Sequence, residues 1–456
     1  MKTIILAAGQ GKRMRSSLQK VLHPICGKTI LQYVVEVAVS AGAEEITVVV
    51  GSDGGEIKNE LAKIFGQRLN FAVQEKPLGT GHAVQAGIEG IEPGDDVLIL
   101  YGDMPLVTAD FIEEMKDYRR DNPCDAVVSA AYFPGTSDFG RVYADEKGFF
   151  DEIVEARDIK PDSTHTDWTN IGIYLFKGAA LLDGLGKMTN DNSQNEYYLT
   201  DVPKIVKDEG GTVRVFQTRE NIATFTGINT QAHLAEAASY MRSRINARHM
   251  ENGVRMLDPS AVYVDDDVEI AQGVVIYPGA ILEGKCKIET GAVIGPGAHM
   301  RDTYVGANAY VRQSVTMGAS IGAGTEVGPF AYLRPGTVIG EGCRIGNFVE
   351  VKNSNLGDGV KMAHLAYIGD ADVGRGVNYS CGAITANYDG KNKFRTTIRD
   401  GAFICSNSNL VAPVEIGEGA FVAAGSTITD NLPGAALGVA RARQYTKLDW
   451  SKPAKL

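Results

Sequence analysis

The sequence of residues 321–350 divides into five hexads that each begin with an aliphatic residue: IGAGTE, VGPFAY, LRPGTV, IGEGCR and IGNFVE. The six-residue spacing recurs on both sides of this stretch, always with Ile, Leu or Val. The recurring positions are Val264, Ile270, Ile276, Leu282, Ile288, Ile294, Ile321, Val327, Leu333, Ile339, Ile345, Val351, Ile398, Ile404, Leu410, Ile416, Val422 and Ile428. A period of six fits neither a helix nor an alternating strand, but it is typical of a hexapeptide β-helix.

In such a fold each hexad forms one flat side, and its aliphatic residue points inward. Three sides close a triangular coil, and coils stack about 4.8 Å apart. Hexapeptide coils of known proteins resemble a left-handed prism, so this resemblance predicts a left-handed parallel β-helix. The ladder is broken between Val351 and Ile398, where turn-forming and basic residues stand at 387–393 (NYDGKNK). A loop that leaves a rigid solenoid is a predicted functional site.

The first half of the sequence follows a different rule. Short apolar runs at 3–8, 46–50, 97–101 and 171–176 alternate with amphipathic segments at 30–40, 55–65 and 109–118. This alternation predicts an α/β domain with a mostly parallel, Rossmann-like sheet and helices on both faces. We therefore expect three parts: an α/β domain at 1–229, a helical linker arm at 230–250, and the β-helix with a C-terminal tail at 251–456.

Composition limits the functions that such a chain can have. Its 456 residues carry a net charge of −11, which argues against a general nucleic-acid-binding protein. The six cysteines lie far apart without metal-ligand spacing, as in a protein of a reducing compartment. The sequence shows neither a signal peptide nor an apolar run long enough to cross a membrane. We expect a cytoplasmic protein without membrane insertion.

A glycine loop follows the first predicted strand and reads LAAGQGKRM at residues 6–14. Glycines let backbone N–H groups approach a phosphate, and Lys12 and Arg13 add positive charge. The loop is neither a Walker motif nor a dinucleotide fingerprint. Alone, it could equally be a plain turn between a strand and a helix.

Together with Lys20-Val21-Leu22, this loop resembles the sugar nucleotidyltransferase family, and the resemblance covers the whole first half. The positions that bind UTP, the product nucleotide sugar or metal in that family are Leu6, Ala7, Ala8, Gly9, Gly11, Arg13, Lys20, Gln74, Gly79, Thr80, Tyr101, Asp103, Gly140, Glu155, Asn170 and Asn229. The resemblance implies that Asp103 and Asn229 hold Mg²⁺ and that Glu155 and Asn170 bind the sugar. The chain departs from the family at Gln19 and at Pro77, where a glutamine often reads the base.

Residues 346–352, 363–370 and 387–390 resemble the acetyltransferase half of the bifunctional N-acetylglucosamine-1-phosphate uridyltransferase family. A base is needed because the amino sugar arrives as an ammonium ion, and histidine suits this task at neutral pH. The resemblance makes His364 that catalytic base. It implies that Arg334, Lys352, Tyr367, Asn378 and Lys393 bind glucosamine-1-phosphate. It implies that Cys381, Asn387, Tyr388, Ser406, Ala424 and Arg441 bind acetyl-CoA. Tyr332, Ala366, Ser380 and Cys381 depart from the common pattern.

The resemblance implies a two-step enzyme of UDP-N-acetylglucosamine synthesis, which supplies a precursor for peptidoglycan, lipopolysaccharide or other envelope glycans. Acetyl-CoA acetylates glucosamine-1-phosphate, and UTP then donates UMP to the product with release of pyrophosphate. The acetyltransferases that the second half resembles form homotrimers. We therefore expect a homotrimer whose acetyl-transfer site is shared between chains. Two alternatives stay open: a nucleotidyltransferase whose β-helix only assembles the oligomer, and a regulator without catalytic activity.

Overall fold

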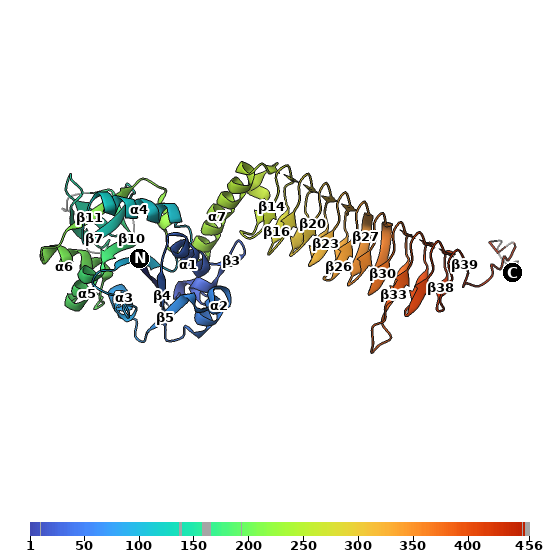
Figure 1. The fold of residues 1–456 in the computed structure, drawn as a ribbon, viewed down its shortest axis with the longest axis horizontal. Coiled ribbons are helices and arrows are strands. Elements are labelled where there is room, and N and C mark those ends of the chain that lie inside the picture. The colour runs from blue at the N-terminus through green and yellow to red at the C-terminus, as the bar shows by residue number, and fades with distance from the viewer. Residues whose placement is uncertain (10, 136–138, 157–165, 193, 449, 452–456) are drawn as a thin grey trace. The chain divides into compact units, whose positions relative to one another are not determined.

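The structure is a computed structural model that describes residues 1–9, 11–135, 139–156, 166–192, 194–448 and 450–451. The chain forms two compact units, Met1–Met241 and Arg242–Leu456 (Figure 1). The boundary lies inside the predicted linker arm. Gln10 of the glycine loop and the last five residues of the tail lie outside the described residues.

The first unit is built on a sheet with the strand order β11-β7-β10-β6-β1-β4-β5. These strands are β1 (Lys2–Ala7), β4 (Glu45–Gly51), β5 (Leu69–Gln74), β6 (Asp96–Tyr101), β7 (Ala126–Tyr132), β10 (Trp168–Lys177) and β11 (Val213–Thr218). Strand β1 pairs in parallel with β4 and β6, whereas β10 is antiparallel to β6 and β7. The four predicted strands and the mostly parallel sheet are therefore confirmed.

Helices cover both faces of this sheet. The α-helices of the unit are α1 (Ile30–Ser40), α2 (Gly55–Phe65), α3 (Thr80–Ala86), α4 (Ala109–Asp121), α5 (Gly178–Lys187) and α6 (Val202–Asp208). One apolar core holds buried residues of α1, α2 and α4, such as Leu31, Leu61 and Phe111. The other core holds buried residues of α3, α5 and α6, such as Val84, Leu181 and Val206. Helices on both faces leave the carboxyl ends of the strands open for a site.

Smaller elements complete the first unit. Strands β8 (Arg141–Ala144) and β9 (Phe150–Val154) form a hairpin that pairs with β10, and β2 (Pro24–Ile25) pairs with β3 (Lys28–Thr29). Short 3₁₀ helices are η1 (Lys12–Met14), η2 (Lys20–Leu22), η3 (Gly66–Arg68), η4 (Leu199–Asp201) and η5 (Ile222–Phe225).

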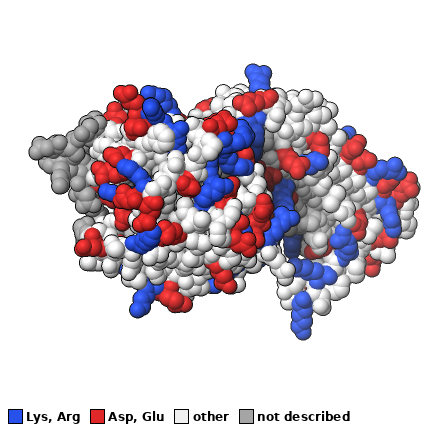
Figure 2. Space-filling view, turned by 60° about the vertical axis from the view of Figure 1, so that its left-hand side comes forward, with Lys and Arg blue, Asp and Glu red and all other residues white. Residues whose placement is uncertain are grey.

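Among the described residues, no helix is both long and apolar enough to span a membrane. On the face drawn in Figure 2, basic and acidic side chains are intermixed.

The second unit is a parallel β-helix with three flat faces. One sheet forms the third face, with strands β14 (Glu269–Ile270), β17 (Lys287–Ile288), β20 (Tyr304–Val305), β23 (Ala319–Ile321), β26 (Thr337–Ile339), β28 (Asn355–Leu356), β30 (Ala371–Val373), β33 (Thr396–Ile398) and β36 (Val414–Ile416). In the first coils Tyr263 pairs with Ile281, which lies three hexads further along the chain. One coil therefore consists of three hexads, as predicted.

The other two faces are joined in a single continuous sheet. The first face contains β12 (Arg255–Met256), β15 (Val275–Ile276), β18 (Val293–Ile294), β21 (Tyr310–Val311), β24 (Glu326–Val327), β31 (Asn378–Tyr379), β34 (Phe403–Ile404), β37 (Phe421–Val422) and β39 (Leu437–Gly438). The second face contains β13 (Tyr263–Val264), β16 (Ile281–Glu283), β19 (His299–Arg301), β22 (Val315–Met317), β25 (Tyr332–Leu333), β32 (Ile384–Ala386), β35 (Asn409–Val411) and β38 (Thr427–Ile428). Strands β27 (Arg344–Lys352) and β29 (Lys361–Gly369) pair with strands of both faces, so they run around the edge between them.

The predicted aliphatic ladder forms the core of this β-helix. All the predicted ladder positions except Ile270 are buried. Ile270 is half-buried because its strand, β14, is the first of the third face and has a neighbour on one side only. Stacked aliphatic side chains therefore hold the coils together, as the hexad pattern predicts.

Helix α7 (Gln231–Glu251) begins within the first unit and ends within the second. Its buried residues Ala237, Met241 and Ile245 lie four residues apart, on one face of the helix. In the second unit, Asn246 Nδ2 donates hydrogen bonds to the carbonyl oxygens of Pro259 at 2.8 Å and Val262 at 3.0 Å. This end of α7, together with the 3₁₀ helix η6 (Pro259–Ala261), covers the first coil.

Candidate functional site

Two adjoining cavities lie at the carboxyl ends of the strands of the first unit. The first, of about 490 Å³, is lined by Leu6, Ala7, Ala8, Gly9, Gly11, Lys12, Arg13, Lys20, Val21, Gln74, Pro77, Gly79, Thr80, Ala83, Tyr101, Asp103, Glu196 and Asn229. The second, of about 420 Å³, shares Thr80, Tyr101, Asp103, Glu196 and Asn229 and adds Gly140, Glu155 and Asn170. Together they collect all the residues that the sequence predicts for the nucleotide, the sugar and the metal.

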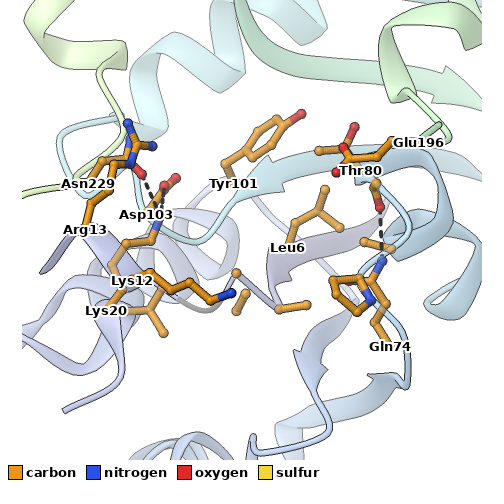
Figure 3. A pocket seen from close by; sticks show the side chains of 18 residues that line it. Leu6, Lys12, Arg13, Lys20, Gln74, Thr80, Tyr101, Asp103, Glu196 and Asn229 are labelled. Atoms are coloured by element: carbon orange, nitrogen blue, oxygen red, sulfur yellow. Dashed lines mark hydrogen bonds and ion pairs between the residues drawn. The ribbon is translucent and has the colours of Figure 1, made fainter. Parts of the chain in front are cut away.

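A cationic side chain lies between the two predicted metal ligands. Lys20 Nζ donates hydrogen bonds to Asp103 Oδ2 at 2.5 Å and to Asn229 Oδ1 at 3.2 Å (Figure 3). Residue Gly227 permits this arrangement, because a Cβ there would meet the Asp103 carboxylate oxygens at 3.0 and 3.1 Å. The pair of oxygens therefore attracts a cation at the junction of the two cavities.

The opposite end of the first cavity carries Gln74. Its Nε2 donates to the carbonyl oxygen of Gly79 at 3.0 Å and lies 3.1 Å from His82 Nδ1. The amide nitrogen is therefore occupied, which leaves the carbonyl oxygen of Gln74 as a hydrogen-bond acceptor. Pro77, where the sequence departs from its family, lines the same cavity.

In the second cavity the predicted sugar ligands are held by neighbours. Asn170 exchanges hydrogen bonds with the Tyr174 hydroxyl, at 2.9 Å and 3.1 Å. Glu155 Oε1 accepts a hydrogen bond from Thr200 Oγ1 at 3.0 Å. Burial raises the pKa of the Tyr101 phenol well above its usual range, so Tyr101 stays neutral between the two cavities.

Sequence reasoning missed one wall of the site. Residues 194–200 contribute Gln194, Glu196, Tyr198 and Thr200 to the cavities. This segment docks through Tyr197, whose N–H donates to the Leu78 carbonyl oxygen at 2.8 Å and whose carbonyl oxygen accepts from Gly81 at 2.8 Å. A Cβ on Gly79 would lie 2.5 Å from that carbonyl oxygen, so the glycine permits the approach. The LGTG run at 78–81 was the available signal, but it does not say which segment packs against it.

In the β-helix, one group of predicted residues gathers on the second face and at its far edge. Arg334 forms an ion pair with Glu350 at 2.9 Å, and Glu350 lies beside Tyr367 in the strand register. Burial, followed by the charge of Glu350, raises the pKa of Tyr367. Contact with the Lys393 ammonium is the main cause that lowers the pKa of Lys352. Two lysines held together in this way indicate a site for a dianion such as a phosphate.

Asn387 and Tyr388 open the loop that carries Lys393. Asn387 is buried and donates a hydrogen bond to Asp370. Tyr388 is 60% exposed, and its hydroxyl donates to the Gly390 carbonyl oxygen at 2.7 Å. The loop leaves the β-helix between β32 and β33, where Figure 1 shows it projecting from the coils.

A second group of predicted residues lines the edge between the first and second faces. His364 lies opposite Asn347 in the strand register and is exposed. The carbonyl oxygens of Leu365, Cys381 and Ser406 accept hydrogen bonds from Gly382, Asn407 and Gly425 of the next coils. This register aligns His364, Cys381, Ser406 and Ala424 in one column. Arg441 extends it, since its Cδ lies 4.0 Å from the Cβ position of Gly425.

The structure does not bring these two groups together within one chain. Lys352 is in register with Gly369, five residues beyond His364 on β29, so the width of the second face separates them. Asn378 lies on the first face, where it pairs with Lys361 and Phe403. Among the described contacts, none joins His364 to the Lys352 group.

No metal centre of protein ligands alone is evident in the described part of the chain, which contains no group of three or more His, Cys, Asp or Glu residues placed to hold an ion. Asp103 and Asn229 supply two oxygen donors. Such a pair suits Mg²⁺, which keeps several ligands from water and from substrate phosphates. None of the six cysteines, all in described segments, forms a disulfide.

Comparisons with known proteins agree with this division. Residues 3–154 match the family model of MobA-like NTP transferase domains, and residues 318–353 and 395–430 match the bacterial transferase hexapeptide family, with six repeats. The hexapeptide match supports a left-handed β-helix. Three relatives, each named bifunctional protein GlmU, align along nearly their full length. The protein of Halalkalibacterium halodurans is 43% identical over 97% of both chains. That of Geobacillus thermodenitrificans is 44% identical over 97% of this chain and 96% of the relative, and that of Clostridioides difficile 40% over 98% and 97%.

Proposed function

The chain belongs to the GlmU family of bifunctional proteins, and from this premise we propose that it carries out the last two reactions of UDP-N-acetylglucosamine synthesis. The β-helix acetylates glucosamine-1-phosphate with acetyl-CoA. The α/β unit then transfers UMP from UTP to the N-acetylated sugar phosphate and releases pyrophosphate. The product supplies the synthesis of peptidoglycan and other envelope glycans. The observation that carries the proposal is that the predicted ligands of UTP and sugar line two adjoining cavities.

In the first unit, the sugar phosphate attacks the α-phosphorus of UTP in line with the departing pyrophosphate. The chain needs no nucleophile of its own, because alignment and charge neutralisation carry such a transfer. Gln74 accepts from the uracil N3–H, while Arg13 and Lys20 bind the triphosphate. Glu155 and Asn170 hold the sugar in the adjoining cavity, with its phosphate directed towards the junction at Asp103.

The junction is also where Mg²⁺ fits. Asp103 and Asn229 present hard oxygen donors and already hold the Lys20 ammonium between them. When bound, the ion supplies neutralisation of the phosphate charge that develops in the transfer. Lys20, which lines the first cavity, would then serve as a ligand of the triphosphate.

In the second unit, His364 removes a proton from the amine of the sugar so that the amine can attack the acetyl thioester. Arg334, Tyr367, Lys352 and Lys393 hold the sugar phosphate on the second face. The edge column continues for three coils from His364 to Ala424, about 14 Å at the usual spacing between strands. A column of that length suits the extended arm of acetyl-CoA, with Arg441 near its phosphates.

The β-helix is proposed to assemble as a homotrimer that shares this site. A general base must come within about 3 Å of the proton that it removes. One chain holds His364 and the Lys352 group at opposite edges of a face, whereas a neighbouring prism can bring its own His364 edge to that group. A heterologous contact of this kind closes into a ring of three. We also propose a cytoplasmic location, because UTP and acetyl-CoA are the substrates.

A nucleotidyltransferase with a merely structural β-helix is the competing function. The clustering of Arg334, Lys352 and Lys393 favours catalysis instead, because a scaffold has no need to hold repelling lysines together. The test is to incubate the purified protein with UTP, Mg²⁺, acetyl-CoA and glucosamine-1-phosphate and to identify the products. We expect UDP-N-acetylglucosamine, pyrophosphate and free CoA. Formation of UDP-N-acetylglucosamine only from a preacetylated sugar phosphate would leave the structural alternative standing.

A further inference from the structure

Asp370 is a buried acidic residue to which the predicted site assigns no role. It follows β29 directly, at the edge between the second and third faces, with a left-handed φ of 51° and only 7% of its surface exposed. Its N–H donates to the Lys352 carbonyl oxygen at 3.1 Å, and its carbonyl oxygen accepts from Thr396 N–H at 3.1 Å. The backbone of Asp370 therefore touches both Lys352 and the end of the loop that carries Lys393.

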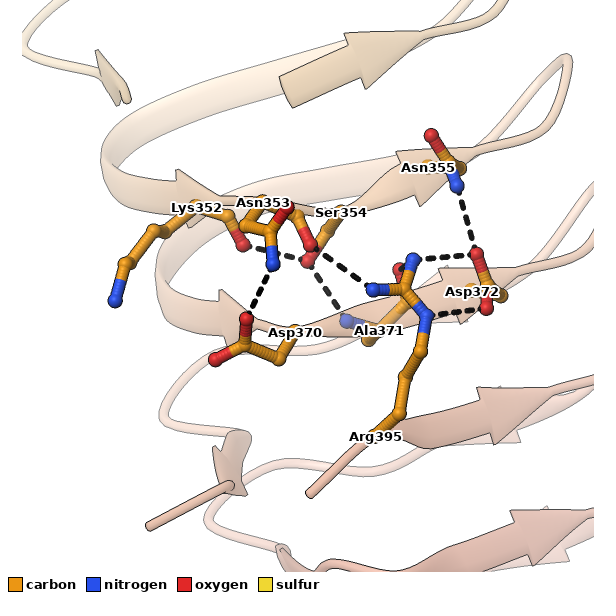
Figure 4. A network of polar contacts seen from close by, with 8 residues as sticks. All are labelled: Lys352, Asn353, Ser354, Asn355, Asp370, Ala371, Asp372 and Arg395. Carbon is orange, nitrogen blue, oxygen red and sulfur yellow. Dashed lines mark hydrogen bonds and ion pairs between the residues drawn. The ribbon is translucent and has the colours of Figure 1, made fainter. Parts of the chain in front are cut away.

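The carboxylate of Asp370 is held by two amides. Asn353 Nδ2 donates to Oδ1 at 2.5 Å, and Asn387 Nδ2 donates to Oδ2 (Figure 4 shows Asn353 and Asp370 facing each other, with Lys352 directed away). Burial alone would favour the neutral acid. The two hydrogen bonds and the nearby lysines outweigh burial, so the pKa of Asp370 is lowered and the group is ionised at neutral pH.

An ionised carboxylate can only accept hydrogen bonds, whereas an asparagine amide has a donor side and an acceptor side. Asn387 must therefore turn its NH₂ group towards Asp370. Its carbonyl oxygen then faces away from the carboxylate and can accept a hydrogen bond. With any partner that could both donate and accept, the Asn387 amide could settle in either of two orientations.

We propose that Asp370 is a positioning residue for acetyl transfer, which fixes the Asn387 amide so that its carbonyl oxygen accepts a hydrogen bond from the amine of the acceptor sugar. The inference rests on the acetyltransferase function proposed above. An amine so held keeps its lone pair directed at the thioester once His364 has taken the proton. The same residue places the phosphate ligand Lys393, because it anchors the loop at Asn387 and at Thr396.

The chain offers a matched control two residues beyond Asp370, on β30. Arg395 ends the same loop and pairs with Asp372, at 2.5 Å from Nε and 2.6 Å from Nη2. Asp372 thus anchors the loop through Arg395 (Figure 4), whereas Asn387 donates its hydrogen bond to Asp370. Asp372→Asn weakens this anchor but leaves the amide orientation alone, so the pair Asp370→Asn and Asp372→Asn separates the two effects.

The experiment compares acetyl transfer by the full-length wild type with that by Asp370→Asn, Asp372→Asn, Asn387→Ala and the double variant Asp370→Asn/Asn387→Ala. Asparagine keeps the shape of Asp370 and tolerates a left-handed backbone, so the fold should persist. We expect Asp370→Asn to lower kcat by about 10- to 100-fold, as misplacement of a reacting group does. The KM for acetyl-CoA should stay within about threefold, and Asp372→Asn should lose much less activity.

The double variant decides whether Asp370 acts through Asn387. If it does, adding Asp370→Asn to Asn387→Ala costs little more, because the amide to be oriented is already gone. Fully additive losses, equal losses in Asp370→Asn and Asp372→Asn, or a near-normal kcat in Asp370→Asn would each overturn the inference. If Asp370→Asn does not fold, Asp370→Glu, which is also acceptor-only, must retain more kcat than Asp370→Ala. Absence of acetyl transfer by the wild type would instead refute the proposed function.

Discussion

The two units of this chain build their candidate sites in opposite ways. In the α/β unit, strand ends, a docked segment and the residues at 227–229 enclose two cavities that the predicted ligands line. Lys20, Asp103 and Asn229 are already in contact there. In the β-helix, the predicted ligands lie on open faces and edges, and the base and the phosphate ligands are a face apart. The first site is thus formed within one chain, whereas for the second we propose that a neighbouring chain supplies the opposite edge.

The largest effect that tests this contrast is expected from a substitution at Asp103. We expect Asp103→Ala to reduce uridylyl transfer by about a thousandfold, because several kcal/mol of charge stabilisation are lost with the Mg²⁺ ligand. Acetyl transfer should not change. Pyrophosphate and CoA release, measured separately, check this. Asp96→Ala, at the far end of the same strand and paired with Lys177, is the control that should keep both activities. A parallel loss of both activities in folded Asp103→Ala would mean that the sites are not independent.

The converse variant is His364→Ala. Loss of a positioned general base should slow acetyl transfer by about 10²- to 10⁴-fold and leave uridylyl transfer intact. The measurement is the rate of CoA release by each variant, with pyrophosphate release measured separately. His299→Ala, on the second face several coils away, is the control. Acetylation at a near-normal rate would reduce His364 to a surface residue.

Mixed oligomers test directly whether two chains contribute residues to one acetyl-transfer site. If His364 and Asn387 come from different chains, equal mixing of His364→Ala and Asn387→Ala chains should restore about a quarter of the wild-type acetylation, the share of sites with both residues intact in a heterologous ring. Mixing His364→Ala with Arg441→Ala should restore none, because these residues line one edge of the same chain. Light scattering should give about three times the 48.8 kDa of one chain. A fully active monomer would refute the shared site.

The smallest expected effect concerns the lysine pair. Since the pKa of Lys352 is lowered mainly by Lys393, the folded state is penalised while both are protonated, and this penalty fades as the pH rises towards the unfolded pKa. Lys393→Met should therefore raise Tm slightly near pH 7, and the gain should shrink at higher pH. The same variant should weaken the binding of glucosamine-1-phosphate in calorimetry. A lower Tm would show that Lys393 stabilises the loop instead.

Much of the fold could be predicted because its rules are local. The hexad ladder requires only that every sixth residue be aliphatic and point inward. The sequence shows this spacing at Ile321 and Leu333, and both side chains are buried in the structure. The helices at 30–40 and 55–65 begin and end where their apolar spacing predicts. The glycine loop and its family resemblance predicted the lining of the first cavity in the same way.

The rest depends on contacts between distant residues. Tyr197 reaches Gly81 through folding of the whole unit, so the sequence could not show that residues 194–200 complete the cavities. Asp370 lies within a stretch quoted for its resemblance, but its bond to Asn387 spans the loop and is visible only in the folded coils. The hexad period also does not show which edge of the prism a residue occupies. The sequence therefore could not show whether His364 and Arg441 lie on the same edge.

The cover that α7 places on the first coil has a consequence for how the β-helix comes apart. In a solenoid each coil contacts only its neighbours, so opening proceeds from an end rather than throughout. Asn246 satisfies the carbonyl groups of Pro259 and Val262 at one end, which closes that end to fraying. Unzipping then starts at the other end, where only β33 and β36 follow β30 on the third face. We therefore expect the coils that carry the acetyl site to be among the first to open, and amide hydrogens there to exchange sooner than those near α7.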